Sequence, residues 1–175
     1  MPVSLARMHS KVETMAEAPT RVNFFDGMLL TGDEMRVEQD YCRRMRYLHN
    51  RLHGHGVVEG LEVTLDRKGD EVHVSPGWAL DAQGREIVLT EERCLPVAED
   101  RVAVVVLTWA EVPAQPVPAR PDDSTLYSRW VEEPELSVVP PGEQPEGALV
   151  LGRVKRGRLG RLSLDVSVRR PLGRD

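Results

Sequence analysis

The chain has few cysteines, few aromatic residues and no long apolar run. Its two cysteines, Cys42 and Cys94, lack the C-x-x-C spacing of redox and zinc motifs, so we expect two separate reduced thiols. Aromatic residues make up 5% of the 175 residues, which predicts an aliphatic core. The longest apolar stretch, VAVVVLTWA at 102–110, is too short to cross a bilayer and is typical of a buried strand.

The chain also lacks an excess of positive charge, and its first twenty residues lack the apolar run that a signal peptide needs. A net charge of -5 argues against a dedicated nucleic-acid-binding protein. The first twenty residues contain no long apolar run, so no signal peptide is predicted. We therefore expect a protein of the cytoplasm, or of an assembled or released particle, with no nucleic-acid partner and no direct membrane insertion.

Motifs that support catalysis are missing as well. The sequence has no G-x-S-x-G nucleophile turn and no H-E-x-x-H zinc motif. The glycines of GHGVVEG at 54–60 follow a helix and lead into a strand, the reverse of the order in a dinucleotide-binding loop. The sequence predicts a protein that is not an enzyme, with no catalytic residue, no metal and no cofactor.

Three histidines within seven residues leave a metalloenzyme as a lesser alternative. His49 and His53 are four residues apart on one helix face and His55 follows two residues later, but zinc needs a third and usually a fourth ligand. Histidine near a helix C-terminus also complements the helix dipole. We favour a structural role, in which His49 and Asn50 brace the end of the helix through hydrogen bonds to backbone groups.

One long helix is predicted near the N-terminus. Thr31 and Glu34 have the spacing of a capping box, and Gly54 and Gly56 end the helical pattern, which places a helix over residues 32–53. Its apolar residues are spaced four, three and four apart, a narrow stripe that suits a sister helix as well as the chain's own sheet. These seam residues are Tyr41, Met45, Leu48 and Leu52.

An apolar cluster precedes this helix. Phe24 and Phe25 are the only phenylalanines, and Met28 follows them after an Asp-Gly turn. We expect the cluster to fix the helix N-terminus in the core. With the seam, Phe24, Phe25 and Met28 form the predicted interface of the protein. Residues 1–20 are predicted to form an arm that docks on its own domain or on a neighbour.

The remainder of the chain has the alternating pattern of β-strands. Hairpins are predicted between 63–65 and 72–74, between 79–80 and 87–89, and around Arg156-Gly157-Arg158. Asp81 and Arg85 are expected to form a salt bridge across the second turn. The stretch at 101–112 is predicted to be a central strand, and Pro134 is predicted to interrupt the strands of 130–140.

These elements predict a mainly β fold with one long N-terminal helix. Eight or nine short strands at regular spacing indicate a β-sandwich or a flattened barrel. We place a single domain at 21–170, led by the helix, with a proline-rich loop or arm at 113–127 and a tail at 171–175.

The stretch FFDGMLLTGDEMRVEQDYCRRMRYLHNRLHGHGVVEGLEV at 24–63 resembles the opening of the type VI secretion baseplate protein TssK. The resemblance rests on Phe25, Gly27, Met28, Leu30, Gln39, Tyr41, Gly56, Val57 and Leu61, with His55 in a position that is tryptophan in that family. A later stretch, LVLGRVKRGRLGRLSLD, is similar through Leu149, Val150, Leu151, Gly152, Arg153, Val154, Leu164 and Asp165. Small proteins of phage-tail-like contractile injection systems share the HNRLHGxGVVxGLEV phrase more closely.

The resemblance implies a β-sandwich shoulder domain that trimerises and docks on other baseplate subunits. We therefore expect a structural or adaptor subunit of a phage-tail-like contractile injection system, acting by assembly, with a trimer favoured. In TssK a helical stalk and a head domain follow this part, so the roles of those parts, including contact with a membrane complex, are not expected of this chain. The alternative is a small carbohydrate- or ligand-binding module, which would expose two of the tryptophans Trp78, Trp109 and Trp130 on one face, although Trp109 is expected in the core.

Overall fold

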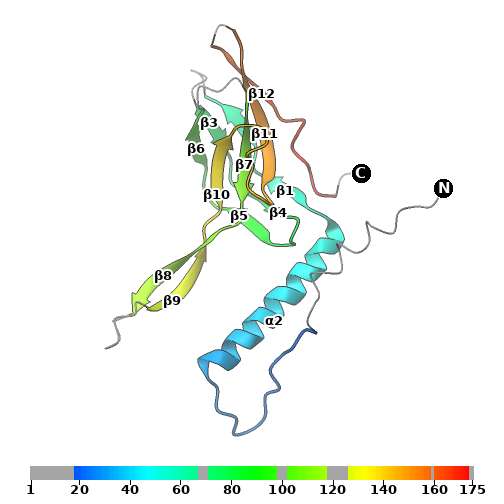
Figure 1. Ribbon diagram of the computed structural model, residues 1–175, viewed down its shortest axis with the longest axis vertical. Helices are drawn as coiled ribbons and strands as arrows, with labels where there is room; N and C mark the ends of the chain where they lie inside the picture. Colours follow the sequence, from blue (N-terminus) through cyan, green and yellow to red (C-terminus); the bar gives the residue numbers. More distant parts are fainter. Residues whose placement is uncertain (1–17, 67–70, 98–101, 118–125, 159, 174–175) are drawn as a thin grey trace, which may run out of the picture. The chain divides into compact units, whose positions relative to one another are not determined.

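The computed structural model describes residues 18–66, 71–97, 102–117, 126–158 and 160–173 (Figure 1). The chain divides into two compact units, Met1–Arg46 and Tyr47–Asp175. The predicted N-terminal arm lies outside the described residues except for 18–20. The predicted limits of the domain at 21 and 170 stay predictions.

Helix α2 (Gly32–Asn50) continues into a short 3-10 helix, η2 (Arg51–His53). The Thr31 hydroxyl accepts a hydrogen bond of 3.3 Å from the backbone N–H of Glu34, as the capping motif predicts. Gly54 then adopts a φ of 84°, a conformation that favours glycine, and the helical run stops there. The predicted helix at 32–53 is thus confirmed at both ends.

The second unit is built from strands. β7 lies at the centre of the four-stranded sheet β10-β7-β11-β12, and the other sheets are β2-β3-β6, β1-β4-β5 and the two-stranded ribbon β8-β9. The described residues form twelve strands, more than the eight or nine expected, because short turns divide several predicted runs. The strands are β1 (Gly56–Gly60), β2 (Val63–Leu65), β3 (Glu71–Val74), β4 (Gly77–Leu80), β5 (Glu86–Leu89), β6 (Arg93–Pro96), β7 (Val102–Thr108), β8 (Glu111–Val117), β9 (Leu126–Glu132), β10 (Glu135–Val139), β11 (Leu149–Arg156) and β12 (Leu162–Asp165).

The predicted hairpins have the expected partners. Val63 pairs with Val74 across β2 and β3, and Ala79 pairs with Ile87 across β4 and β5. The last hairpin turns at Gly157, whose N–H donates to the Arg161 carbonyl at 2.8 Å. Each of these hairpins joins neighbouring segments, so a turn and an alternating pattern were enough to predict it.

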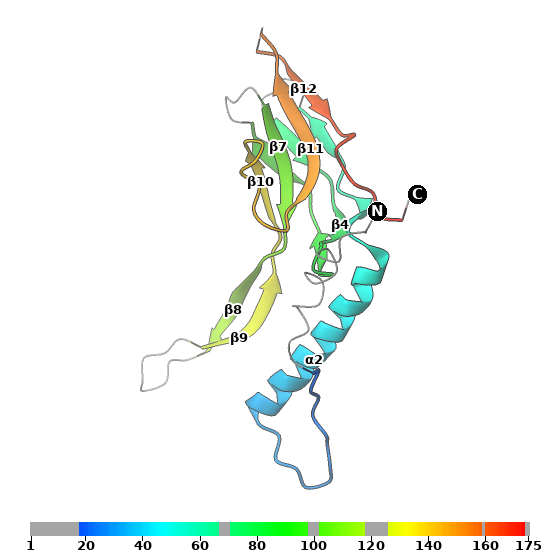
Figure 2. The ribbon, with the colours of Figure 1, turned by 45° about the vertical axis from the view of Figure 1, so that its right-hand side comes forward.

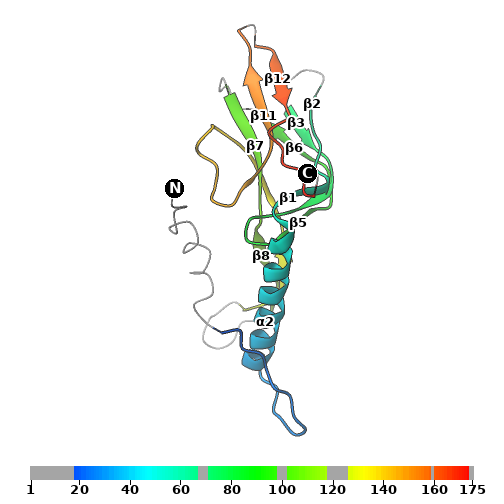
Figure 3. The ribbon, with the colours of Figure 1, turned by 90° about the vertical axis from the view of Figure 1, so that its right-hand side faces the viewer.

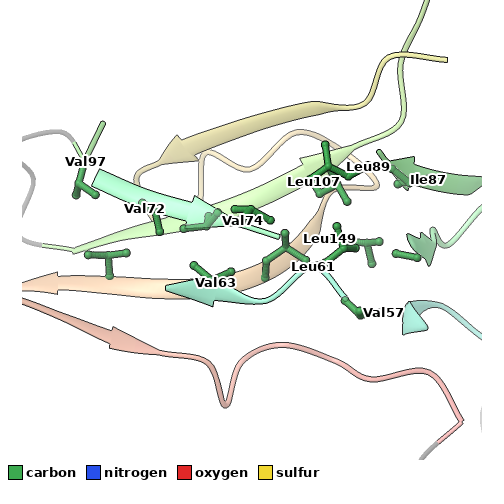
Figure 4. Close-up of a cluster of buried hydrophobic side chains, with 14 of the residues drawn as sticks. Val57, Leu61, Val63, Val72, Val74, Ile87, Leu89, Val97, Leu107 and Leu149 are labelled. Atoms are coloured by element: carbon green, nitrogen blue, oxygen red, sulfur yellow. The ribbon is translucent and has the colours of Figure 1, made fainter. Parts of the chain in front are cut away.

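One aliphatic core joins the three larger sheets of this unit. Buried side chains from β2 and β3, from β7 and β11, and from β4 and β5 enter a single cluster (Figure 4). Side chains of two sheets that meet in one core are typical of a β-sandwich, so the predicted fold class is confirmed. Figure 4 labels Val57, Leu61, Val63, Val72, Val74, Ile87, Leu89, Val97, Leu107 and Leu149.

Strand β7 has the central place that its sequence predicts. It pairs antiparallel with β10 on one side and β11 on the other. Residues 103–107 are all buried, as expected for a strand covered on both faces. β9 and β10 are separate strands on either side of 133–134, so the break predicted at Pro134 is confirmed.

Two glycines allow β1 and β4 to approach closely. Gly60 adopts a φ of 62°, and a Cβ atom on it would collide with the Pro76 carbonyl oxygen. A Cβ atom on Gly77 would collide with the Glu59 carbonyl oxygen. Glycine is therefore required at both positions for β1 and β4 to pair at this end, where Gly60 lies opposite Gly77.

The segment after β12 returns to β1. The Arg170 carbonyl accepts a hydrogen bond of 2.8 Å from the Val57 N–H, and the Leu172 N–H donates to the Val57 carbonyl at 2.7 Å. Figure 3 shows the segment that follows β12 running beside β1. Pro171 and Leu172 of the predicted tail thus pair with Val57 of β1.

Candidate assembly surfaces

The β8–β9 ribbon exposes large apolar side chains on both of its faces. It extends from the ends of β7 and β10, beyond the sheet that these strands form (Figure 2). Every residue of β9 is exposed, with 66% of Trp130 and 48% of Tyr127 open to solvent. Leu126, Val131 and Val112 are exposed on the same ribbon.

An isolated two-stranded ribbon is only marginally stable in water. The strands of this ribbon pair from Glu111 with Glu132 to Val117 with Leu126, with one gap in the pairing at Gln115. It contributes no residue to the buried core cluster. Exposed aromatic side chains on such a ribbon are typical of a surface that another protein covers.

The predicted proline-rich loop at 113–127 is in part this ribbon. Residues 113–117 belong to β8 and residues 126–127 to β9, and the residues between them lie outside the described part of the chain. Prolines are tolerated there because both strands of a two-stranded ribbon are edges. Gln115, between Pro113 and Pro116, adopts a φ of 55° and interrupts the pairing.

The helix seam is only partly covered. No residue of α2 is buried. Met45 is 39% exposed, and Leu52, which lies in η2, is 80% exposed. Tyr41 and Leu48 are half-buried. The role of these four residues as an interface stays a prediction.

The apolar cluster before the helix lies on the surface, which corrects the prediction that it enters the core. Phe24 is 53% exposed and Phe25 is 65% exposed, while Met28 is half-buried. In residues 18–46 only Val22 is buried. The reason is that the strands of the second unit supply the side chains of the core cluster. Exposed phenylalanines keep the cluster available for an interface, the role predicted for it.

The three histidines do not gather around one point. The His49 and His53 rings meet edge to face with centroids 5.2 Å apart. His55 Nε2 instead lies 3.1 Å from an Arg170 guanidinium nitrogen. The neighbouring Asn50 amide donates to the Gly84 carbonyl and to Glu86 Oε1, both at 2.9 Å. Asn50 thus braces the helix end against the β4–β5 turn, as predicted.

The environment of His55 predicts a pH effect on stability. Burial, and then the positive charge of Arg170, lower the pKa of His55, although Asp81 acts in the opposite direction. The unfolded chain takes up a proton near pH 6.5 that the folded chain resists, so His55 makes the fold less stable as pH falls below that value.

We expect the variant His55→Gln to lose less stability than the wild type between pH 7.5 and pH 5.5. Urea unfolding at the two pH values measures the difference. Equal losses in the two proteins would show that His55 does not contribute.

The tryptophans lie in different parts of the fold. Trp109 packs against the core cluster, with the Arg85 guanidinium carbon 4.6 Å from its ring centroid. Trp78, on β4, is 37% exposed, and Trp130 lies on β9. The two exposed tryptophans therefore belong to different sheets. They do not form the shared aromatic surface on one sheet that the ligand-binding alternative predicts.

In the described residues, no helix is both long and apolar enough to cross a membrane.

Comparison with known proteins gives similarity in structure but not in sequence. No protein-family model matches the chain, and no curated protein matches it. Three solved structures are similar to this chain, and each match covers 85% of its residues. They are a crystal structure of TssK (14% identity, TM-score 0.52), a type VI secretion TssK-TssF-TssG baseplate subcomplex (12%, 0.56) and a type VI secretion baseplate complex (11%, 0.53).

The matching part is a fraction of each of those chains. It covers 41%, 60% and 58% of their lengths, so this chain spans about half of the proteins that it resembles. At these identities the likeness concerns the fold. The resemblance to TssK drawn from the sequence is thereby confirmed in three dimensions: the chain has the fold of part of a type VI secretion baseplate protein.

Proposed function

We propose that this chain is a structural or adaptor subunit of a phage-tail-like contractile injection system, located at its baseplate. It acts through protein–protein assembly and not through catalysis. The observation that carries the proposal is the β8–β9 ribbon, which exposes Trp130 and Tyr127 on a sandwich with the fold of baseplate proteins.

The ribbon suits a protein partner. Aromatic side chains are enriched at the centres of protein interfaces, where they carry much of the binding energy. A specific interface of ordinary size buries about 800 Å² on each partner. Four exposed apolar residues of the ribbon belong to one strand, with Leu126 and Trp130 on one face and Tyr127 and Val131 on the other. A partner that closes around both faces of the ribbon would cover all four.

The structural neighbours support a role in assembly with other subunits. One matching structure contains TssK with TssF and TssG, and another is a whole baseplate complex. We propose that this chain binds the corresponding subunits of its own particle. It would then be found in the cytoplasm or in an assembled or released particle.

The helix seam supports self-association. Met45 and Leu52 are exposed at coiled-coil spacing, the half-buried Leu48 lies between them, and the half-buried Tyr41 precedes Met45 on the same stripe. Phe24, Phe25 and Met28 extend the apolar surface before the helix. We propose a homotrimer in which these residues meet their copies.

Light scattering on the purified full chain tests the trimer. We expect a mass of three chains that does not change with concentration, and a lower mass for Leu48→Glu, because a charge cannot be buried unpaired in an apolar seam. Val88→Glu is the matched control, since Val88 is exposed on β5, outside the seam. A concentration-independent monomer would exclude self-association and leave the adaptor role.

Purification of the tagged chain from its own cells tests the adaptor role. We expect subunits of a contractile apparatus to be recovered in fixed ratio to the tagged chain, as identified by mass spectrometry. Recovery of the chain without any such subunit, from cells that assemble the particle, would overturn the proposed function.

A further inference from the structure

A histidine, a glutamate and a cysteine meet on the outer face of the β2-β3-β6 sheet. β3 pairs with β6, and His73 lies directly opposite Cys94. Val72 and Val74, on either side of His73, point into the core, so the alternation of a strand turns His73 outward. Glu92 lies two residues before Cys94, just before β6 begins.

The three side chains point at one another. His73 Nδ1 lies 3.2 Å from Glu92 Oε1 and 3.4 Å from Cys94 Sγ. One donor atom from each residue lies within 4.8 Å of the other two. Glu92 and Cys94 are exposed and His73 is half-buried, so a dissolved ion can reach all three.

Hydrogen bonds among His73, Glu92 and Cys94 do not account for both short contacts of the His73 ring. An ionised carboxylate only accepts hydrogen bonds, and a thiol is a weak donor and a weak acceptor. If Nδ1 carries a proton, it donates to Glu92 and Cys94 gains little. If Nδ1 is unprotonated, it accepts from Cys94 but faces a carboxylate oxygen without a proton between them. In either tautomer one of the two short contacts has no strong hydrogen bond.

A cation at the centre satisfies all three groups, since each offers it a lone pair. Zinc bonds of about 2.0–2.1 Å to nitrogen, 2.0–2.2 Å to oxygen and 2.3 Å to sulfur place tetrahedral ligands about 3.4 Å (N to O) and about 3.6 Å (N to S) apart. The observed separations of 3.2 and 3.4 Å differ from these by about 0.2 Å. The separations of Nδ1 from the other two ligand atoms therefore match those of a tetrahedral zinc site, and all three ligand atoms lie within 4.8 Å of one another.

We propose that His73, Glu92 and Cys94 bind a zinc-like divalent cation through three protein ligands, with the fourth position open to water. Imidazole, thiolate and carboxylate together suit zinc and cobalt better than magnesium or calcium, which prefer oxygen ligands alone. The site is separate from the ribbon and from the helix seam, so it does not depend on the proposed assembly role.

Titration of the purified full chain with Co²⁺ tests the proposal. We expect one Co²⁺ per chain, a thiolate-to-cobalt charge-transfer band, the visible bands of tetrahedral cobalt, and loss of these bands when Zn²⁺ displaces Co²⁺. Cys94→Ser should remove the charge-transfer band. Loss of a residue that hydrogen-bonds to a metal ligand typically weakens metal binding about 10–100-fold. Because His73→Ala removes a ligand itself, it should weaken Zn²⁺ binding by about 100-fold or more.

Cys42→Ser is the matched control, because Cys42 is the other exposed cysteine. It should keep the cobalt spectrum of the wild type. Circular dichroism verifies that each variant is folded, and Glu92→Gln, a conservative change on an exposed residue, provides a second variant. A wild-type protein with no charge-transfer band, a folded Cys94→Ser with unchanged Zn²⁺ affinity, or loss of the band in Cys42→Ser would each overturn the proposal.

Discussion

Replacement of Asp81 by alanine is expected to lower the free energy of unfolding by about 3–5 kcal/mol, the usual effect of removing one partner from a buried ion pair. Asp81 is 1% exposed and is the one buried charged residue in the described part of the chain. Its Oδ2 accepts a hydrogen bond of 2.6 Å from Arg85 Nε. Without the carboxylate, the half-buried guanidinium would lose its partner.

The same carboxylate also holds the backbone of the β4–β5 turn. Asp81 Oδ1 accepts hydrogen bonds of 2.9 Å from the N–H groups of Gln83 and Arg85. This turn also supports the end of the helix, because the Gly84 carbonyl accepts a hydrogen bond from the Asn50 side-chain amide. Alanine leaves these N–H groups without their acceptor, and buried unsatisfied groups are costly. Asparagine keeps an acceptor oxygen, so Asp81→Asn should lose less stability than alanine.

Urea unfolding of the two Asp81 variants measures these losses. Asp40→Ala is the matched control: Asp40 pairs with Arg43 at 2.6 Å on the exposed helix surface, where an ion pair contributes about 0.5 kcal/mol. If Asp81→Ala lost no more stability than Asp40→Ala, the buried network would not stabilise the turn.

Interactions between residues close in the sequence were predicted well. The Asp81–Arg85 ion pair, the Thr31 cap and the three hairpins each depend on a few neighbouring residues whose spacing fixes their geometry. The central position of β7 was predictable too, because a run of apolar residues on both faces suits only a covered strand.

Interactions between distant segments were not predicted. Phe24 and Phe25 were expected in the core on their apolar character, but exposure depends on whether other elements already fill that core. His73 and Cys94 meet because β3 pairs with β6, a strand that is not its neighbour along the chain. A sequence pattern gives the face of each residue but not the register of such a pair. Prolines likewise concealed the β8–β9 ribbon, since they are rare in strands other than edges.

The second large effect is expected at the β8–β9 ribbon. Trp130→Ala should weaken binding to the partner subunits by at least about 2 kcal/mol, or roughly 30-fold in the dissociation constant, as for an aromatic residue at the centre of an interface. Adding Tyr127→Ala to Trp130→Ala should weaken binding to the partner subunits further. Neither change should alter the stability of the isolated chain by more than about 0.5 kcal/mol, because both side chains are largely exposed.

The measurement compares the partner subunits recovered with each tagged variant, and urea unfolding of the same proteins. Trp78→Ala is the matched control, because Trp78 is a partly exposed tryptophan in another sheet. Loss of binding in Trp130→Ala with unchanged stability, together with normal binding in Trp78→Ala, would assign the contact to the ribbon. Full recovery of the partners with the double variant Trp130→Ala and Tyr127→Ala would remove the ribbon from the interface. The apolar surface of the helix would then have to make the contact, because the ribbon and the seam are the two exposed apolar surfaces on which the proposed assembly rests.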